Sequence, residues 1–120
     1  MDSELWLTPC IYCGNIADSV DHVPPISARD GIMALRLTRP PRFIEVPSCR
    51  ECNSALGNRA LWTVTERKAW IKAWVRKRSR KYLVIPEWDK EDLGALGPNA
   101  RMFVNAGLEK QRIVRQRLAW

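Results

Sequence analysis

The sequence predicts a small α+β domain that carries a basic helical extension at its C-terminal end. Three observations support this fold class: two cysteine pairs of identical spacing, two short strand-like segments that each end at proline, and a run of basic residues with helical periodicity. The chain has 120 residues, of which 46% are hydrophobic. We therefore expect a single domain, with a core over about residues 5–62 and an extension over about residues 63–120.

The sequence also predicts where the protein resides. No apolar run approaches the ~18 residues that a membrane span requires. The first four residues, Met1 to Glu4, are acidic and lack the basic and apolar regions of a secretory signal. We expect a cytoplasmic protein with no membrane partner.

The four cysteines predict a metal site. Cys10 and Cys13 form one pair, Cys49 and Cys52 form a second, and 35 residues separate the pairs. Two such pairs supply the four sulfur ligands of a tetrahedral structural zinc. Two disulfides would need an oxidising compartment, and four buried free thiols would have no reason to share one spacing. We therefore expect a closed zinc site that stabilises the fold.

The order of elements follows from turn residues and periodicity. Residues 19–23 and 42–46 read as strands, with a loop over 26–41 between them in which residues 32–35 form one helical turn. A short helix is expected from Asn53 onward. A longer helix is expected over residues 63–81. A turn-rich connector with one helical turn should follow over residues 86–98, and a last helix over residues 100–119.

Charge is concentrated in one part of the chain. The protein carries a formal charge of +7, yet the segment from Arg59 to Tyr82 alone sums to +8 and the remainder to −1. Such a segment is typical of a phosphate-binding surface, although it would also suit a solvated helix face. We expect nucleic acid to contact its nine basic residues: Arg59, Arg67, Lys68, Lys72, Arg76, Lys77, Arg78, Arg80 and Lys81.

Three polar residues near the cysteines are candidates for catalysis. Asp21 and His22 are neighbours on the first predicted strand, so their side chains point to opposite faces and do not simply pair. They suit two separate tasks, a hard oxygen ligand for a divalent cation and a general base near neutral pH. Asn53 follows the last cysteine and offers a neutral oxygen, although it would equally suit a helix N-cap.

These motifs together resemble a known family. Cys10-x2-Cys13, Asp21-His22-Val23-Pro24-Pro25 and the run from Val46 to Asn53 are similar to HNH endonucleases of the ββα-metal, or His-Me finger, superfamily. The likeness is greatest to small zinc-containing phage members, among them the phage recombination endonucleases that resolve branched DNA. It covers about residues 10–60, which is about half of the chain.

The resemblance implies a fold, an activity and roles for individual residues. It implies a zinc-fastened ββα-metal core with Cys10, Cys13, Cys49 and Cys52 on the structural zinc. His22 would be the general base, while Asp21 and Asn53 would hold one catalytic Mg²⁺ or Mn²⁺. The implied function is metal-dependent hydrolysis of DNA phosphodiester bonds.

The sequence also departs from the family pattern. Members often place Asn or His between the two strands or on the second, where its backbone carbonyl orients the catalytic imidazole. Residues 23–48 contain neither type. Asn58, Arg59 and Glu66 lie near the expected site, and we interpret Glu66 as the partner of Thr63 in a helix capping box.

The alternative function is a zinc-stabilised nucleic-acid-binding adaptor or regulator without catalytic turnover. Both functions predict the four zinc ligands and the basic helix, with DNA as the expected partner of the nuclease. Only the nuclease requires Asp21, His22 and Asn53 at one divalent-metal site. For a phage-encoded nuclease we expect the host cytoplasm, a monomer or homodimer, and other phage DNA-processing proteins as further partners. Substrate preference is left open, because it depends on the attached helices.

Overall fold

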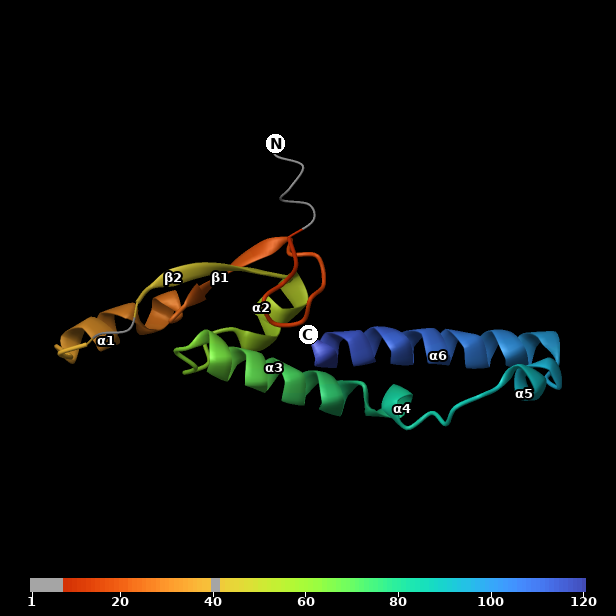
Figure 1. Ribbon diagram of the computed structural model, residues 1–120. Helices are drawn as coiled ribbons and strands as arrows, with labels where there is room; N and C mark the ends of the chain where they lie inside the picture. Colours follow the sequence, from red (N-terminus) through yellow and green to blue (C-terminus); the bar gives the residue numbers. More distant parts are fainter. Residues whose placement is uncertain (1–7, 40–41) are drawn as a thin grey trace. The chain divides into compact units, whose positions relative to one another are not determined.

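The computed structural model describes residues 8–39 and 42–120 (Figure 1). Met1 to Glu4, from which the cytoplasmic location was predicted, and the end of the predicted loop over 26–41 lie outside these residues. The elements are β1 (Ser19–Val23), a 3-10 helix η2 (Ile26–Ala28), α1 (Arg29–Ala34), β2 (Ile44–Ser48), α2 (Arg50–Leu56), α3 (Val64–Arg78), α4 (Arg80–Leu83), α5 (Lys90–Gly94) and α6 (Pro98–Ala119). The α+β class is therefore confirmed: a two-stranded antiparallel hairpin is followed by helices, the last of which is long.

The chain forms two compact units. The first extends to Ala73 and includes Trp120, and the second spans Trp74–Ala119. The division falls inside α3, whereas the sequence suggested a boundary near residue 62. The first turns of α3 belong with the first unit because Arg67 and Ile71 are fully buried there.

The hairpin has one feature that the sequence did not predict. β1 covers the predicted residues 19–23, but β2 begins and ends two residues later than expected and includes Pro47. Pro47 lies opposite Val20, and its carbonyl accepts a hydrogen bond from the amide of Ile11 at 3.0 Å. Proline is tolerated here because its nitrogen faces the same side as this carbonyl, away from β1, so the pairing of the two strands loses no amide donor.

The helix α2 completes a ββα-like segment and starts earlier than expected. Cys49 is its N-cap, and the Cys49 sulfur accepts the amide hydrogen of Cys52 at 3.4 Å. Asn53 is consequently inside the helix, so the N-cap interpretation of that residue is wrong. Gly57 ends the helix with a φ of 48°, a backbone angle that favours glycine.

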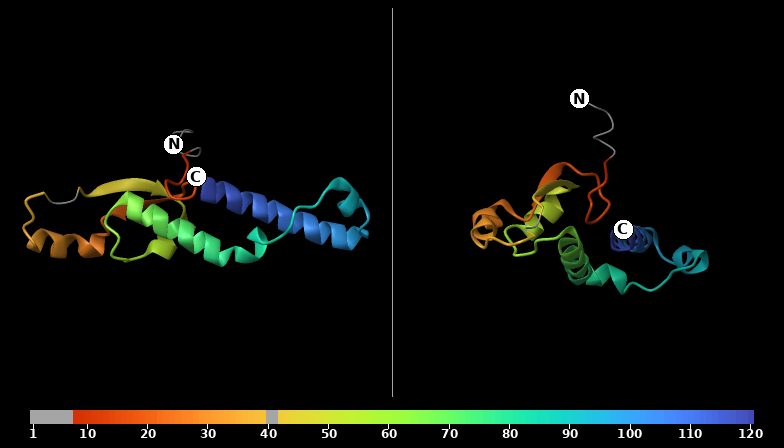
Figure 2. Two further views of the ribbon diagram at one scale, coloured as in Figure 1. Left: turned by 60° about the horizontal axis from the view of Figure 1, so that its bottom comes forward. Right: turned by 60° about the vertical axis from the view of Figure 1, so that its left-hand side comes forward.

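The segment between the strands is more helical than predicted. Instead of one turn over residues 32–35, it forms η2 and α1, and only Ile32 of α1 is buried. Figure 2 shows the two strands side by side, with η2 and α1 following β1 at one end of the hairpin. This arrangement leaves Pro25, Ile26 and Ser27 beside the pocket described below.

The predicted helix over residues 63–81 is divided at Ser79. One of the two bonds of the predicted capping box is present at its start: the Thr63 hydroxyl accepts the amide hydrogen of Glu66 at 3.1 Å. The Glu66 carboxylate accepts from the Thr63 hydroxyl at 3.0 Å. Ile71 and Val75 are buried, as their spacing predicted, whereas Trp70 and Trp74 are only half-buried. Their rings lie under the guanidinium groups of Arg59 and Arg78, at 4.1 Å and 5.0 Å from the ring centroids.

The second unit is organised around α6. Figure 2 shows α6 as an unbroken helix and the chain from α4 through α5 leading back to its start. Buried Gln111 of α6 donates its side-chain amide to the carbonyls of Tyr82 and Ile85, at 2.9 and 2.8 Å. These two hydrogen bonds fix the end of α4 and the following turn against α6. Among the described residues, no helix is long and apolar enough to cross a membrane.

Candidate functional site

The four cysteines form one buried cluster. Cys10 and Cys13 lie in the turn before β1, and Cys49 and Cys52 flank the first turn of α2. The four sulfur atoms all lie within 4.8 Å of one another, and the sulfurs of Cys13 and Cys49 are 3.7 Å apart. A tetrahedral zinc with Zn–S bonds of about 2.3 Å requires sulfur separations of about 3.8 Å. The cluster therefore fits a structural zinc, and its four thiols are free of disulfides.

Local backbone hydrogen bonds hold the cysteines in place. The Gly14 amide donates to the carbonyl of Cys10 at 2.9 Å, and Gly14 has a φ of +78° that closes the first turn. In the second pair, the Asn53 amide donates to the carbonyl of Cys49 at 3.0 Å. The second pair is thus built into the start of α2, directly beside Asn53.

The acid–base chemistry of the four thiols is compatible with metal binding. Burial raises the pKa of the Cys49 thiol to about 11. Hydrogen bonds from Cys13 and Cys52 lower the pKa of Cys10, while the bond that Cys52 donates to Cys10 raises the pKa of Cys52. Four buried thiolates in contact would repel one another strongly, and a divalent metal removes that cost by binding all four sulfurs.

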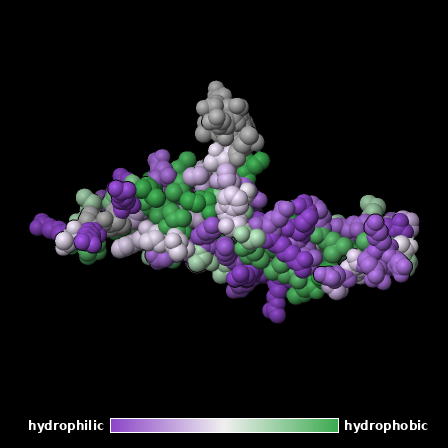
Figure 3. Space-filling model, in the orientation of Figure 1, coloured by the Kyte–Doolittle hydropathy of each residue, from purple (hydrophilic) through white to green (hydrophobic). Residues whose placement is uncertain are grey.

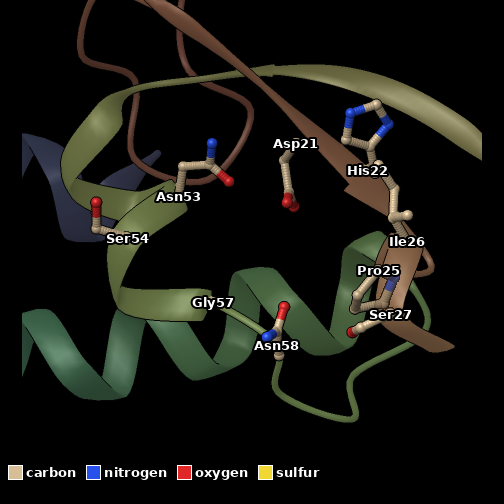
Figure 4. A pocket seen from close by; sticks show the side chains of 9 residues that line it. All are labelled: Asp21, His22, Pro25, Ile26, Ser27, Asn53, Ser54, Gly57 and Asn58. Atoms are coloured by element: carbon tan, nitrogen blue, oxygen red, sulfur yellow. The ribbon is translucent and has the colours of Figure 1, made fainter.

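A second site lies beside the cluster. A pocket of about 290 Å³ is lined by the following residues: Asp21, His22, Pro25, Ile26, Ser27, Asn53, Ser54, Gly57 and Asn58 (Figure 4). The structure thus brings together the three residues that the sequence marked as catalytic. β1 supplies Asp21 and His22, and α2 supplies Asn53, so the ββα-like segment frames the pocket.

Asp21 is the most constrained of the three. Its side chain is buried, and both carboxylate oxygens accept from Arg67: Nε donates to Oδ2 at 2.8 Å and Nη2 donates to Oδ1 at 3.0 Å. The hydroxyl of Tyr12 donates to Oδ2 as well. Burial and this carboxylate together raise the pKa of Tyr12, so the phenol keeps its proton.

His22 is more accessible. Its side chain is 40% exposed, and it faces away from the side chain of Asp21, as expected for neighbours on a strand (Figure 4). Directly across the hairpin is Glu45, whose Oε1 lies 3.6 Å from Nδ1 of His22. This carboxylate was not predicted, because the partner of His22 depends on strand register.

Asn53 joins α2 to β1. Its side-chain nitrogen donates to the carbonyl of Val20 at 3.2 Å, and its oxygen points toward the pocket in Figure 4. Ser27 and Ser54 also line the pocket and were not singled out from the sequence. Ser54 follows Asn53 on α2, but only the tertiary structure brings Ser27 to the same place. Asn58, which was expected nearby, is part of the lining.

The basic residues of the predicted nucleic-acid surface do not share one environment. Arg67 is fully buried against Asp21, so its place among the DNA-binding residues is corrected: its charge neutralises a carboxylate of the core. Lys68 and Lys72 are half-buried, and the Lys68 ammonium donates to the backbone carbonyl of Trp120 at 3.1 Å. The remaining members of the set are exposed: Arg59, Arg76, Lys77, Arg78, Arg80 and Lys81.

Comparison with known proteins adds no relative. The chain matches no protein-family model, no curated protein and no solved structure. What the structure defines is therefore a class of architecture: a ββα-like segment with a buried four-cysteine cluster that suits zinc.

Proposed function

We propose that the protein is a metal-dependent endonuclease of the HNH type that hydrolyses phosphodiester bonds of DNA. The observation that carries the proposal is the pocket itself, which places an acid, an imidazole and an amide on a ββα-like frame. A phosphodiester needs an activated water on one side and a stabilised leaving oxygen on the other. The three side chains suit this division of tasks.

Asp21 and Asn53 would hold the divalent ion. Each carboxylate oxygen accepts at two lone pairs. Oδ2 of Asp21 already accepts from Tyr12 and Arg67, whereas Oδ1 accepts one hydrogen bond, from Arg67, among the described residues. Oδ1 and the pocket-facing oxygen of Asn53 are therefore the available ligand atoms. A bound Mg²⁺ or Mn²⁺ would stabilise negative charge on a phosphate oxygen and on the leaving group.

His22 would act as the general base. Because Glu45 lies beside Nδ1, we assign proton abstraction from water to Nε2. The Glu45 carboxylate would stabilise the positive charge that the ring then acquires, and its position across the hairpin would limit the rotation of the ring. In this respect Glu45 would supply the orienting group for which residues 23–48 offer no Asn or His.

DNA is the proposed substrate because the protein exposes a cluster of positively charged side chains. The exposed basic residues Arg76, Lys77 and Arg80 follow one another closely at the end of α3 and the start of α4. Contacts from such residues to phosphates give affinity without sequence preference. Supercoiled plasmid is therefore the first substrate to use.

The test compares wild type with His22→Ala on supercoiled plasmid at low salt, with Mg²⁺, Mn²⁺ or no added divalent ion. The matched control is Val20→Thr, an exposed β1 position that does not line the pocket. We expect metal-dependent nicking or linearisation in wild type and control, and its loss in His22→Ala at equal zinc content and unchanged circular dichroism. Absence of cleavage by wild type on plasmid, branched and single-stranded DNA would overturn the proposal.

The second candidate is a zinc-stabilised DNA-binding protein without turnover. The observation in its favour is the burial of Asp21 and its bidentate pair with Arg67, which satisfies the carboxylate without a metal. The two candidates differ in divalent-ion binding. Titration of the zinc-loaded protein with Mn²⁺, followed by water-proton relaxation, should show one site that Asn53→Ala weakens if the nuclease proposal is correct. No Mn²⁺ binding would favour the second candidate.

A further inference from the structure

The second unit contains a groove that the proposed nuclease site does not use. It has a volume of about 650 Å³ and lies between α4, the turn that follows it and the first half of α6. Tyr82, Trp88 and Phe103 supply aromatic rings, and Lys81 and Lys110 supply the only charges among the lining residues, with no acid. Sites for small organic ligands have this size and this predominantly apolar lining.

The base of the groove is formed where the turn after α4 packs on α6. Gly107 of α6 lies where a Cβ atom would come within 3.0 Å of the Ile85 side chain, so the turn packs directly on the helix backbone. The two hydrogen bonds from Gln111 to the carbonyls of Tyr82 and Ile85 hold the same turn. The shape of the groove is thus set by part-buried contacts within the second unit.

The rim, in contrast, is exposed. Phe103 is 82% accessible, although exposure of so large an apolar side chain is unfavourable. Both lysine ammonium groups approach the Tyr82 ring, at 5.0 Å for Lys81 and 5.2 Å for Lys110. Figure 3 shows apolar atoms near α4 bordered by hydrophilic side chains. The groove therefore offers aromatic surface and positive charge at one place.

We propose that this groove binds an unpaired nucleotide of a single-stranded nucleic acid, with the base against the aromatic rings and its phosphate at Lys81 and Lys110. A nucleotide combines the two properties that the groove complements, a flat apolar face and a negative charge. Apart from the two lysines, Tyr82 and Trp88, the side chains that line the groove carry no hydrogen-bonding atom, so little remains to read base edges. Binding should accordingly tolerate any base.

Charge also favours this occupant over a second copy of the chain. The second unit, residues 74–119, has eleven basic and five acidic side chains and a net charge of +6. Two such units would repel each other, whereas a phosphate strand would be attracted. The inference rests on the proposed function only in that both take nucleic acid as the ligand.

Fluorescence anisotropy with short labelled oligonucleotides tests the groove. The full chain carries His22→Ala to prevent cleavage, and its affinity for oligothymidylate is compared with that for an abasic strand of equal length. We expect oligothymidylate to bind about tenfold more tightly than the abasic strand, because stacking of one base on an aromatic ring contributes an affinity gain of that order. Phe103→Ala should remove this difference, while Met102→Ala, which is 72% exposed and outside the groove lining, should retain it.

Two results would overturn the inference. One is equal affinity of wild type for the two strands, since phosphates alone would then explain binding. The other is a dimer in sedimentation velocity that Phe103→Ala dissociates, since a second copy would then cover the groove. Failure of the nuclease proposal is recognised separately, because plasmid cleavage depends on His22 and the anisotropy difference depends on Phe103.

Discussion

The guanidinium group of Arg67 in α3 binds both carboxylate oxygens of Asp21 in β1, at 2.8 and 3.0 Å, and both side chains are buried. The third nitrogen, Nη1, donates to the carbonyl of Leu61 at 3.1 Å. One arginine therefore joins the hairpin, the segment before α3 and α3 itself. It also fixes the carboxylate that lines the candidate pocket, so the stability of the first unit and the geometry of the pocket are coupled.

Removal of one partner of this pair should destabilise the protein strongly. Arg67→Met keeps an apolar stem but leaves the Asp21 carboxylate buried without its cation. We expect a loss of about 3–5 kcal/mol in the free energy of unfolding, measured by urea denaturation of the zinc-loaded protein. The matched control is Lys77→Met, an exposed residue of the same helix, for which we expect a change within about 0.5 kcal/mol.

The double variant Arg67→Met with Asp21→Asn identifies the origin of that loss. Since the uncompensated charge is then gone, the double variant should be less destabilised than the sum of the two single variants. Additive losses would show that packing of the Arg67 side chain, and not its charge, is what stabilises the first unit.

Tyr12→Phe isolates the third hydrogen bond that the Asp21 carboxylate accepts. The substitution removes only the hydroxyl that donates to Oδ2 and leaves the buried ring in place. Because hydrogen bonds to charged groups contribute about 1.5–3 kcal/mol, we expect a loss in that range by thermal or urea unfolding. Tyr82→Phe serves as the comparison, since its hydroxyl is exposed and meets Lys110. Equal effects of the two substitutions would contradict a special role for the buried hydroxyl.

The cysteine cluster predicts one zinc ion per chain under reducing conditions. Native mass spectrometry should show this stoichiometry, and Cys52→Ser, which replaces a fully buried thiol, should lower it. Because the ligands bind as thiolates, zinc should be released as the pH falls, with loss of secondary structure in the first unit. Ser54→Ala, an exposed neighbour on α2, should keep zinc at the wild-type stoichiometry. A chain that folds equally well after complete chelation would contradict this prediction.

Local signals predicted what depends on local structure. The cysteine spacing predicted the cluster, the alternation of β1 predicted that Asp21 and His22 separate, and Thr63 with Glu66 predicted the start of α3. Arg67 could not be distinguished from its basic neighbours, because a count of charges does not show which one faces a buried acid. Glu45 was missed for a similar reason: its position beside His22 depends on strand pairing, and β2 lies two residues further along the chain than its proline suggested.

The exposed basic residues predict a salt-dependent contact with DNA that Arg67 does not share. The variant with Arg76→Gln, Lys77→Gln and Arg80→Gln should retain the fold, because all three side chains are exposed. On duplex DNA, each lost phosphate contact should reduce the slope of log Kd against the logarithm of the salt concentration by about 0.9. The reduction should be the same for DNA duplexes of unrelated sequence. Arg112→Gln is the control, since Arg112 is exposed but pairs with Glu109. An unchanged slope in the triple variant would place the duplex on another surface of the protein.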